Sequence, residues 1–146
     1  MTSTAPGHVT HRSSVMQAQC DHMGHMNVRH YVAKFDEATW VLFADIGLTP
    51  SYFKTSGMGM AALEMNIRYM AELLAGDVIT ITSTLLEIKD KIIIYDHTMT
   101  NSQTGKTAAT CYEVAVHLDR QARKSCPFPG NLKSRMQNAL NATQIC

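Results

Sequence analysis

The twelve residues from Cys20 to Tyr31 combine side chains that could act on a substrate: one carboxylate, three imidazoles, a glycine and an asparagine. Asp21 is the only carboxylate among them. A carboxylate that lies near imidazoles and Arg29, and near the start of a helix, should stay ionised, as a general base or a nucleophile must. Asp21 is therefore the first candidate for a catalytic residue.

Asn27 is a preferred residue type for a helix cap, and it precedes a helical pattern that starts at Val28. No acidic residue follows in the first turn, so the free N–H groups of that turn should attract negative charge. Such an end could bind a phosphate, or stabilise the oxyanion that forms when a carbonyl is attacked. Gly24 would let a substrate approach the backbone closely. A carboxylate beside these N–H groups is the arrangement of a hydrolase that acts by acyl transfer.

Other roles are open for the same residues. Asp21 could instead stabilise a turn, a common role of aspartate in loops. His25 could donate a hydrogen bond to a substrate, or pack at the entry to the helix. A metal is a further alternative for the stretch from Cys20 to His25, but structural zinc needs four well-placed ligands and the remaining histidines offer no matching second pair. We therefore expect no metal at this site.

A single long helix follows this stretch. Apolar residues recur with the three-and-four spacing of one helix face, at Val28, Tyr31, Val32, Phe35, Ala38, Leu42 and Ile46. Gly47, with Pro50 just beyond it, provides the stop signal. We predict a helix of about 30 Å from Asn27 to Ile46, with Tyr31 in the core or in the wall of a pocket.

Strand patterns surround this helix in the sequence. We predict a first strand at Val9–Met16 and four more after the helix, at residues 57–69, 78–88, 92–100 and 107–118. The predicted apolar face of the second strand is Ala61, Leu63, Met65, Ile67 and Tyr69, and the last strand alternates through Ala108, Thr110, Tyr112, Val114, Val116 and Leu118. Glu64 should be exposed or paired with Arg68, with a place in a pocket as the alternative. Short turns between consecutive strands predict an antiparallel meander, and hence an α+β fold with the helix on one face of the sheet.

The composition is that of one domain. The chain has 146 residues, enough for a core that we place at about residues 9–119, and its net charge of +1 gives no broad basic surface for nucleic acid. The four cysteines, Cys20, Cys111, Cys126 and Cys146, lack the spacing of a disulfide framework, which favours free thiols in a reducing compartment. No apolar leader precedes His8, and no run approaches the ~20 residues that span a bilayer. We expect a cytoplasmic protein whose partners are small molecules or protein.

The last segment, residues 120–146, is basic. It contains five basic residues and no acid: Arg120, Arg123, Lys124, Lys133 and Arg135. Two prolines and a glycine interrupt it at residues 126–130, and Leu132 to Leu140 could form a short amphipathic helix. The main interpretation is a solvated terminus. In the alternative, the basic residues bind the phosphates of a ligand such as coenzyme A.

The run Asp21-x-x-Gly24-His25-x-Asn27-x-x-x-Tyr31, followed by Phe35-Asp36-Glu37-Ala38 and Gly47, resembles the hotdog-fold acyl-CoA thioesterases of the hydroxybenzoyl-CoA thioesterase family. The likeness in element order covers about Val9 to Asp119. It implies a long central helix wrapped by a curved five-stranded antiparallel sheet. It also implies that two subunits pair their sheets and that the active sites form at the subunit interface.

The same resemblance assigns roles to residues. Asp21 would be the catalytic carboxylate, and backbone N–H groups near Asn27 and Val28 would polarise the thioester carbonyl. Tyr31 would line the acyl pocket. His25 matches a histidine that takes part in plant acyl-carrier thioesterases, although Met23 stands where those enzymes have an asparagine. The implied reaction is hydrolysis of a small or medium acyl-CoA by a homodimer or a dimer of dimers, with coenzyme A present only as part of the substrate.

Two other functions are open within this fold, since a fold alone does not assign chemistry. A hotdog protein could bind an acyl thioester or a partner without turning it over. A hotdog hydratase or dehydratase would need a histidine with an acidic partner placed for proton transfer at carbon. No such pair is evident in the sequence.

Overall fold

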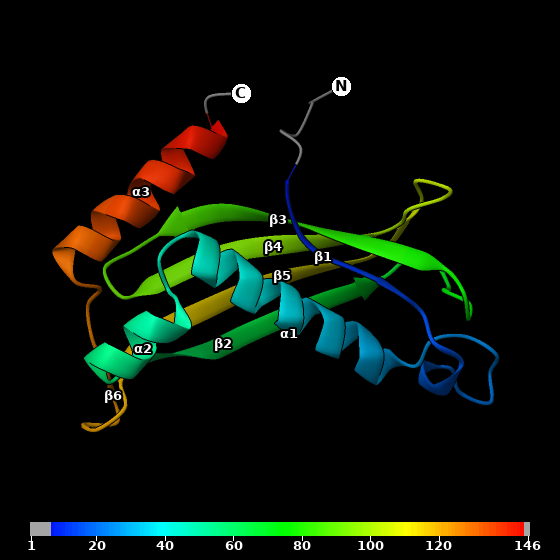
Figure 1. Ribbon diagram of the computed structural model, residues 1–146, viewed down its shortest axis with the longest axis horizontal. Helices are drawn as coiled ribbons and strands as arrows, with labels where there is room; N and C mark the ends of the chain where they lie inside the picture. The colour runs from blue at the N-terminus through cyan, green and yellow to red at the C-terminus, as the bar shows by residue number, and fades with distance from the viewer. Residues whose placement is uncertain (1–6, 145–146) are drawn as a thin grey trace.

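The structure, a computed structural model, describes residues 7–144 of the chain, so Cys146 lies outside the described residues. The elements are β1 (His8–Ser14), a 3-10 turn (Gln17–Gln19), α1 (Val28–Asp45), α2 (Pro50–Ser56), β2 (Met58–Tyr69), β3 (Val78–Ile88), β4 (Ile92–Asn101), β5 (Thr107–Asp119), β6 (Lys124–Ser125) and α3 (Gly130–Gln144). Figure 1 shows α1 lying across one face of the long strands. None of the helices in the described part of the chain is long and apolar enough to cross a membrane.

The sheet has the order β1-β3-β4-β5-β2, with β6 added beside β5, and every pairing is antiparallel. The meander β3-β4-β5 is formed by neighbours in sequence. The first two strands instead lie at opposite edges, and α1 connects them across the sheet (Figure 1). This arrangement confirms the predicted α+β hotdog fold, in which one long helix is covered by a curved antiparallel sheet.

Most of the apolar stripe predicted for α1 faces the sheet, whereas Val28 and Val32 near its start are exposed. Tyr31, Phe35, Ala38 and Leu42 are buried in two clusters that side chains of β3, β4 and β5 complete. Burial of a large apolar side chain such as Phe35 stabilises a fold by roughly 1.5–3 kcal/mol. Because these contacts run along the helix, they set the position of its N-terminus relative to the sheet.

The predicted alternation was wrong in part of β2 and in β5, although Met65 and Ile67 of the predicted β2 face pack against the core. In β2 the register shifts between Ala62 and Glu64, and Leu63, predicted to be buried, is 59% exposed. A β-bulge of this kind turns later side chains to the other face. In β5 the sheet buries the set that begins Ala109, Cys111 and Glu113, whereas Tyr112 of the predicted face is exposed. Alternation in this strand identifies two faces without saying which of them meets the helix.

The interpretation of residues 120–146 as a solvated terminus was wrong for α3. Leu132, Met136 and Leu140 of this helix, with Phe128 before it, are buried in the second apolar cluster. Gly47 explains how the helix packs so closely: a Cβ atom there would lie 2.9 Å from Leu132 Cδ1, and its φ of +105° also favours glycine. α3 therefore belongs to the core.

Candidate active site

The loop between the 3-10 turn and α1 is closed by its own backbone. Cys20 and Met26 form an isolated antiparallel bridge, and the Asp21 N–H donates to the His25 carbonyl at 3.1 Å. At the tip, the Gly24 N–H donates to the Asp21 carbonyl at 3.0 Å, and the φ of Gly24 is +86°. A left-handed residue is needed for this turn, which is a conformational reason for glycine there. The loop thus places Asp21 beside the start of α1.

Both carboxylate oxygens of Asp21 accept hydrogen bonds. Asn27 Nδ2 donates to Oδ2 at 2.8 Å, and the Met23 N–H donates to Oδ1 at 2.8 Å. These two hydrogen bonds lower the pKa of Asp21 because they stabilise the ionised form, and the bond from Asn27 has the larger effect. The bond to Met23 is the turn role considered for this residue, and the bond to Asn27 adds a connection to the helix.

Asn27 joins this carboxylate to the helix cap. Its Oδ1 accepts from the Arg29 N–H at 3.1 Å, which confirms it as the N-cap of α1, while its Nδ2 donates to Asp21. No acid follows in the first turn. Among residues 7–144, the Val28 N–H has no hydrogen-bond acceptor. The first turn of α1 therefore offers a free donor near an ionised carboxylate.

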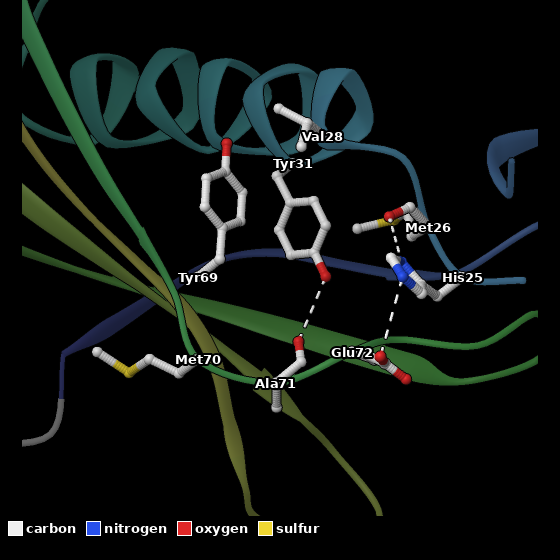
Figure 2. Close-up of a pocket in the computed structure, with 8 residues that line it drawn as sticks. All are labelled: His25, Met26, Val28, Tyr31, Tyr69, Met70, Ala71 and Glu72. Atoms are coloured by element: carbon white, nitrogen blue, oxygen red, sulfur yellow. Dashed lines mark hydrogen bonds and ion pairs between the residues drawn. The ribbon is translucent and has the colours of Figure 1, made fainter. Parts of the chain in front are cut away.

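A cavity of about 310 Å³ opens next to this loop (Figure 2). It is lined by His25, Met26, Val28, Tyr31, Tyr69, Met70, Ala71 and Glu72. The rings of Tyr31 and Tyr69 meet edge to face, with centroids 5.1 Å apart, and the Tyr31 hydroxyl donates to the Ala71 carbonyl at 3.4 Å. His25 Nε2 lies 3.9 Å from a Glu72 carboxylate oxygen. Of the predicted residues, His25, Val28 and Tyr31 line the cavity directly.

The other predicted residues lie elsewhere. Asp21, Gly24 and Asn27 form the loop and cap beside the cavity rather than its lining. Glu64 is exposed on the edge strand β2 and does not line this cavity.

The basic residues predicted to bind phosphates line a second cavity, of about 280 Å³, near the start of β2. Arg120 there is already bound, since its guanidinium donates to the carbonyls of Phe53 (2.7 Å) and Gly57 (3.3 Å) at the end of α2. The twelve residues of β2 separate this second cavity from the first, roughly 35 Å along an extended strand.

A metal site has no candidate in the described part of the chain, where no three His, Cys, Asp or Glu side chains come together in a geometry that could bind an ion. Cys20, Cys111 and Cys126 are free thiols.

The structure also contains a buried polar network that the sequence did not reveal. His97 Nδ1 lies 2.5 Å from Ser83 Oγ and its Nε2 lies 2.9 Å from Thr39 Oγ1. Glu113 accepts from the Tyr95 hydroxyl at 2.7 Å and lies 3.6 Å from His97. Both side chains are buried beneath α1: the exposed fraction is 0% for the His97 side chain and 3% for the Glu113 side chain. This is a histidine–acid pair, as a hydratase would need, but a substrate cannot reach it.

The network makes a prediction about pH and stability. Burial lowers the pKa of His97 to about 4, so from pH 6.5 downward the unfolded chain takes up a proton that the folded protein does not, and stability falls by up to about 1.4 kcal/mol per pH unit. Burial raises the pKa of Glu113, which acts in the opposite direction, because the folded protein binds that proton at higher pH than the unfolded chain does.

Glu113→Gln should therefore steepen the loss of stability between pH 7 and pH 5, since only the contribution of His97 remains. Urea unfolding at both pH values measures the difference. Glu87→Gln, which removes an exposed carboxylate on β3, is the matched control. Equal pH slopes for wild type and Glu113→Gln would contradict this account of the pair.

The family model of the thioesterase-like superfamily matches residues 15–136 of the chain. A relative from Agrobacterium fabrum, L-carnitine dehydrogenase/betainyl-CoA thioesterase, is 31% identical over 92% of this chain and 27% of its own length, so the chain spans about a quarter of that relative. Betainyl-CoA thioesterase from Pseudomonas aeruginosa is 25% identical over 88% of this chain and 80% of its own. A Staphylococcus aureus protein solved in complex with CoA superposes with a TM-score of 0.85 at 22% identity, covering 92% of this chain and 85% of that one. The chain belongs to the thioesterase-like superfamily, as the sequence motif around Asp21 predicted.

Proposed function

We propose that this chain is a thioester hydrolase that cleaves an acyl-CoA into a free acid and CoA at the N-terminus of α1. One observation carries the proposal: a single side chain, Asn27, both caps α1 and binds the Asp21 carboxylate. An ionised carboxylate and a free N–H of the first helical turn are thereby brought together beside a cavity. Membership of a thioesterase family supports the same chemistry.

Asp21 can act by two routes. As a general base it takes a proton from a water molecule, whose oxygen attacks the thioester carbonyl carbon; the C–S bond then breaks and CoA leaves as the thiol. As a nucleophile it attacks the carbonyl carbon itself, CoA leaves, and water hydrolyses the mixed anhydride. Both routes use the ionised carboxylate and develop negative charge on the carbonyl oxygen. The Val28 N–H would stabilise that charge.

The cavity in Figure 2 would contain the acyl group. Tyr31, His25 and Val28 line it, and Gly24 leaves the loop tip open because no atom approaches within 4 Å of the place of a Cβ. His25 would assist as a hydrogen-bond donor, and the backbone N–H would contribute more.

We propose that no metal takes part. We also propose a cytoplasmic, reducing location, which the free thiols of Cys20, Cys111 and Cys126 support.

We propose a homodimer, or a dimer of dimers, in which two β2 edges pair. β2 is an edge strand with an exposed apolar side chain, Leu63 (59%), and an open edge of this kind is a ready pairing surface. Two-fold symmetry would run the two β2 strands antiparallel, so that Met58 of one subunit lies near Tyr69 of the other. Sedimentation velocity tests this, and a monomer at micromolar concentration contradicts it.

This pairing would bring the basic residues of one subunit to the acyl cavity of the other, where they could bind the phosphates of CoA. Arg123 and Lys124 are the exposed residues free for that role, whereas Arg120 already binds carbonyls at the end of α2. Replacing Arg123 and Lys124 with glutamine should raise the Michaelis constant for an acyl-CoA about 10-fold and leave turnover nearly intact, because bound substrate and transition state lose the same interaction. The corresponding acyl-pantetheine lacks the nucleotide phosphates and is the control. An equal rise for both substrates would contradict phosphate binding.

The acyl group can be narrowed by a substrate panel. The activities named for two relatives include betainyl-CoA hydrolysis, and betainyl is a short acyl group with a fixed positive charge. Neutral short and medium acyl groups are the alternative for this chain. Release of free thiol from a panel of acyl-CoAs, read with a thiol-reactive dye, tests the proposed hydrolysis. A protein that binds these thioesters and releases no thiol would instead be a non-catalytic binding protein.

A further inference from the structure

The charged groups of the acyl cavity are unevenly distributed. Its lining has one carboxylate, Glu72, one imidazole, His25, and no lysine or arginine. The Glu72 side chain is 73% exposed and approaches His25 only to 3.9 Å, beyond hydrogen-bond distance. Figure 2 shows the Glu72 carboxylate beside His25, with Tyr31 between this pair and Tyr69. The Glu72 carboxylate is therefore the single acidic group of the lining, and its nearest basic group there is His25 at 3.9 Å.

The two tyrosines form an aromatic corner. Their ring planes are 86° apart and their centroids 5.1 Å apart, so the edge of one ring meets the face of the other. Tyr31 is buried, while Tyr69 is 48% exposed and still has ring surface to offer. A cation near the face of an aromatic ring is attracted by about 0.5–2 kcal/mol. The remaining surface comes from Met26, Val28 and Met70, whose side chains are apolar.

These groups fit an ammonium that has no N–H to donate. A quaternary ammonium makes no hydrogen bonds, so it is recognised by aromatic faces and by the field of a carboxylate, and its methyl groups pack on apolar surface. A neutral alkyl chain in the same place would cover the Glu72 carboxylate without offsetting its charge, which is unfavourable.

The site is also polarised along its length. The first turn of α1 favours negative charge at Val28, where the carbonyl oxygen of a thioester would lie. Glu72 favours positive charge on the other side of the cavity. A substrate with an oxyanion at one end and a fixed cation at the other matches both.

We propose that Glu72 and Tyr69 select acyl groups that carry a fixed positive charge, a short trimethylammonium acyl group being the type substrate. This rests on the proposed thioester hydrolysis at the same cavity. In the complex the ammonium takes the position opposite the Glu72 carboxylate that His25 approaches in the free protein. Tyr69, from the end of β2, contributes ring surface, and Tyr31 forms the inner wall.

The test compares two thioesters of the same shape, trimethylammonioacetyl-CoA and 3,3-dimethylbutanoyl-CoA, which differ by nitrogen in place of carbon and by one charge. Wild type should hydrolyse the charged thioester with a kcat/KM at least about 10-fold above that of the neutral one, a ratio equivalent to 1.4 kcal/mol. Glu72→Gln should lower this ratio about 10-fold, through the charged substrate alone, and the ratio that remains reflects the greater intrinsic reactivity of a thioester with an α-ammonio group. The exposed side chain of Glu72 makes the substitution safe for the fold. Glu87→Gln, near the far end of β3, removes one negative charge outside the cavity and should leave the ratio unchanged.

The aromatic part has its own pair of variants. Tyr69→Leu should lower kcat/KM for the charged thioester about 3- to 30-fold, the range that loss of a cation–π contact implies, and Tyr69→Phe should restore it because the ring is kept. The neutral thioester should respond to neither variant by more than about 3-fold.

Hydrolysis of both thioesters at equal rates, or an unchanged ratio in Glu72→Gln, overturns the proposed charge selection and leaves the hydrolase proposal in place. If neither thioester releases thiol, the hydrolase proposal fails instead. The two unreacted thioesters then serve as binding probes, and equal dissociation constants for wild type would overturn charge selection as well.

Discussion

Replacing Asp21 with asparagine is expected to lower the catalytic rate about 10²- to 10⁴-fold while the Michaelis constant changes little. Asparagine has the same shape and can still accept the hydrogen bond that the Met23 N–H donates at 2.8 Å. It has no basicity, so neither the general-base route nor the nucleophilic route remains. Steady-state thiol release measures the rate, and titration with the acyl-CoA confirms that the variant still binds.

Asp77 provides a matched control for that variant. It too is a loop aspartate whose carboxylate accepts a backbone hydrogen bond, from the Leu74 N–H at 2.8 Å. Asp77→Asn should therefore reproduce the effect of the substitution on a loop that an aspartate stabilises through a backbone hydrogen bond, and turnover should stay near wild type. A near-normal rate in Asp21→Asn would show that Asp21 only stabilises its loop.

The pH profile gives the same residue a second readout. The hydrogen bonds from Asn27 and Met23 lower the pKa of Asp21, so its carboxylate stays ionised well into the acid range. On the acid side, kcat should therefore decline only at pH values below the ordinary pKa of an aspartate, about 3.9. This applies wherever the protein remains folded.

Asn27→Asp is expected to reduce turnover about 10²-fold while α1 keeps its cap. Aspartate caps a helix as well as asparagine does, so the acceptor for the Arg29 N–H is retained. The amide donor to Asp21 is replaced by a second carboxylate at the same distance. Two carboxylates that share a site raise the pKa of one of them, so the acid limb of kcat should move to higher pH.

Asn27→Ser separates the two roles of this residue. Serine also caps helices, but its short hydroxyl cannot replace the amide that donates to Asp21. Its loss in rate should be smaller than that of Asn27→Asp, and the acid limb should move upward less. Unfolding measurements should find Asn27→Ser close to wild type in stability, whereas Asn27→Asp should be less stable at neutral pH because its two carboxylates repel each other. Wild-type kinetics in Asn27→Asp would show that the contact between Asn27 and Asp21 does not serve catalysis.

The parts of the fold that were predictable from the sequence depend on local signals. The cap at Asn27 and the stop at Gly47 bounded α1 because capping is decided within a few residues. Helix α2 was missed because its seven residues bury no complete apolar face. The docking of α3 was missed because Met136 is buried only when Leu48 and Tyr95, distant in sequence, complete the same cluster.

The strand faces show a different limit. His97 lies between the inward-facing Tyr95 and Met99 on β4, and Glu113 lies between Cys111 and Ala115 on β5, so a period of two could have identified both as buried. Their polarity argued for the opposite face. A closed hydrogen-bond network makes burial of these groups possible, and such a network forms only after β3, β4, β5 and α1 have come together.

The candidate site likewise combines residues that are close in sequence with residues that only the fold brings together. Asp21 and Asn27 are six residues apart in one loop, and their combination was visible in the sequence. Tyr69, the last residue of β2, and Glu72, three residues beyond it, come about forty residues later and approach the start of α1 only through the sheet. The residues proposed for catalysis could therefore be singled out from the sequence, whereas the residues that would select the acyl group could not.

A single-turnover reaction in ¹⁸O water tests the central claim most directly, because it follows the oxygen atom that hydrolysis must add. With enzyme in excess over acyl-CoA, we predict one ¹⁸O per thiol released, found either in the free acid or in the Asp21 carboxylate, and no release by Asp21→Asn in the same time. Label in Asp21 indicates the nucleophilic route, with water attacking the Asp21 carboxyl carbon of the anhydride. Label in the acid alone arises from the general-base route or from attack of water on the acyl carbon of that anhydride. Label in any other carboxylate of the protein, or thiol release by Asp21→Asn at the wild-type rate, would contradict the assignment of catalysis to Asp21.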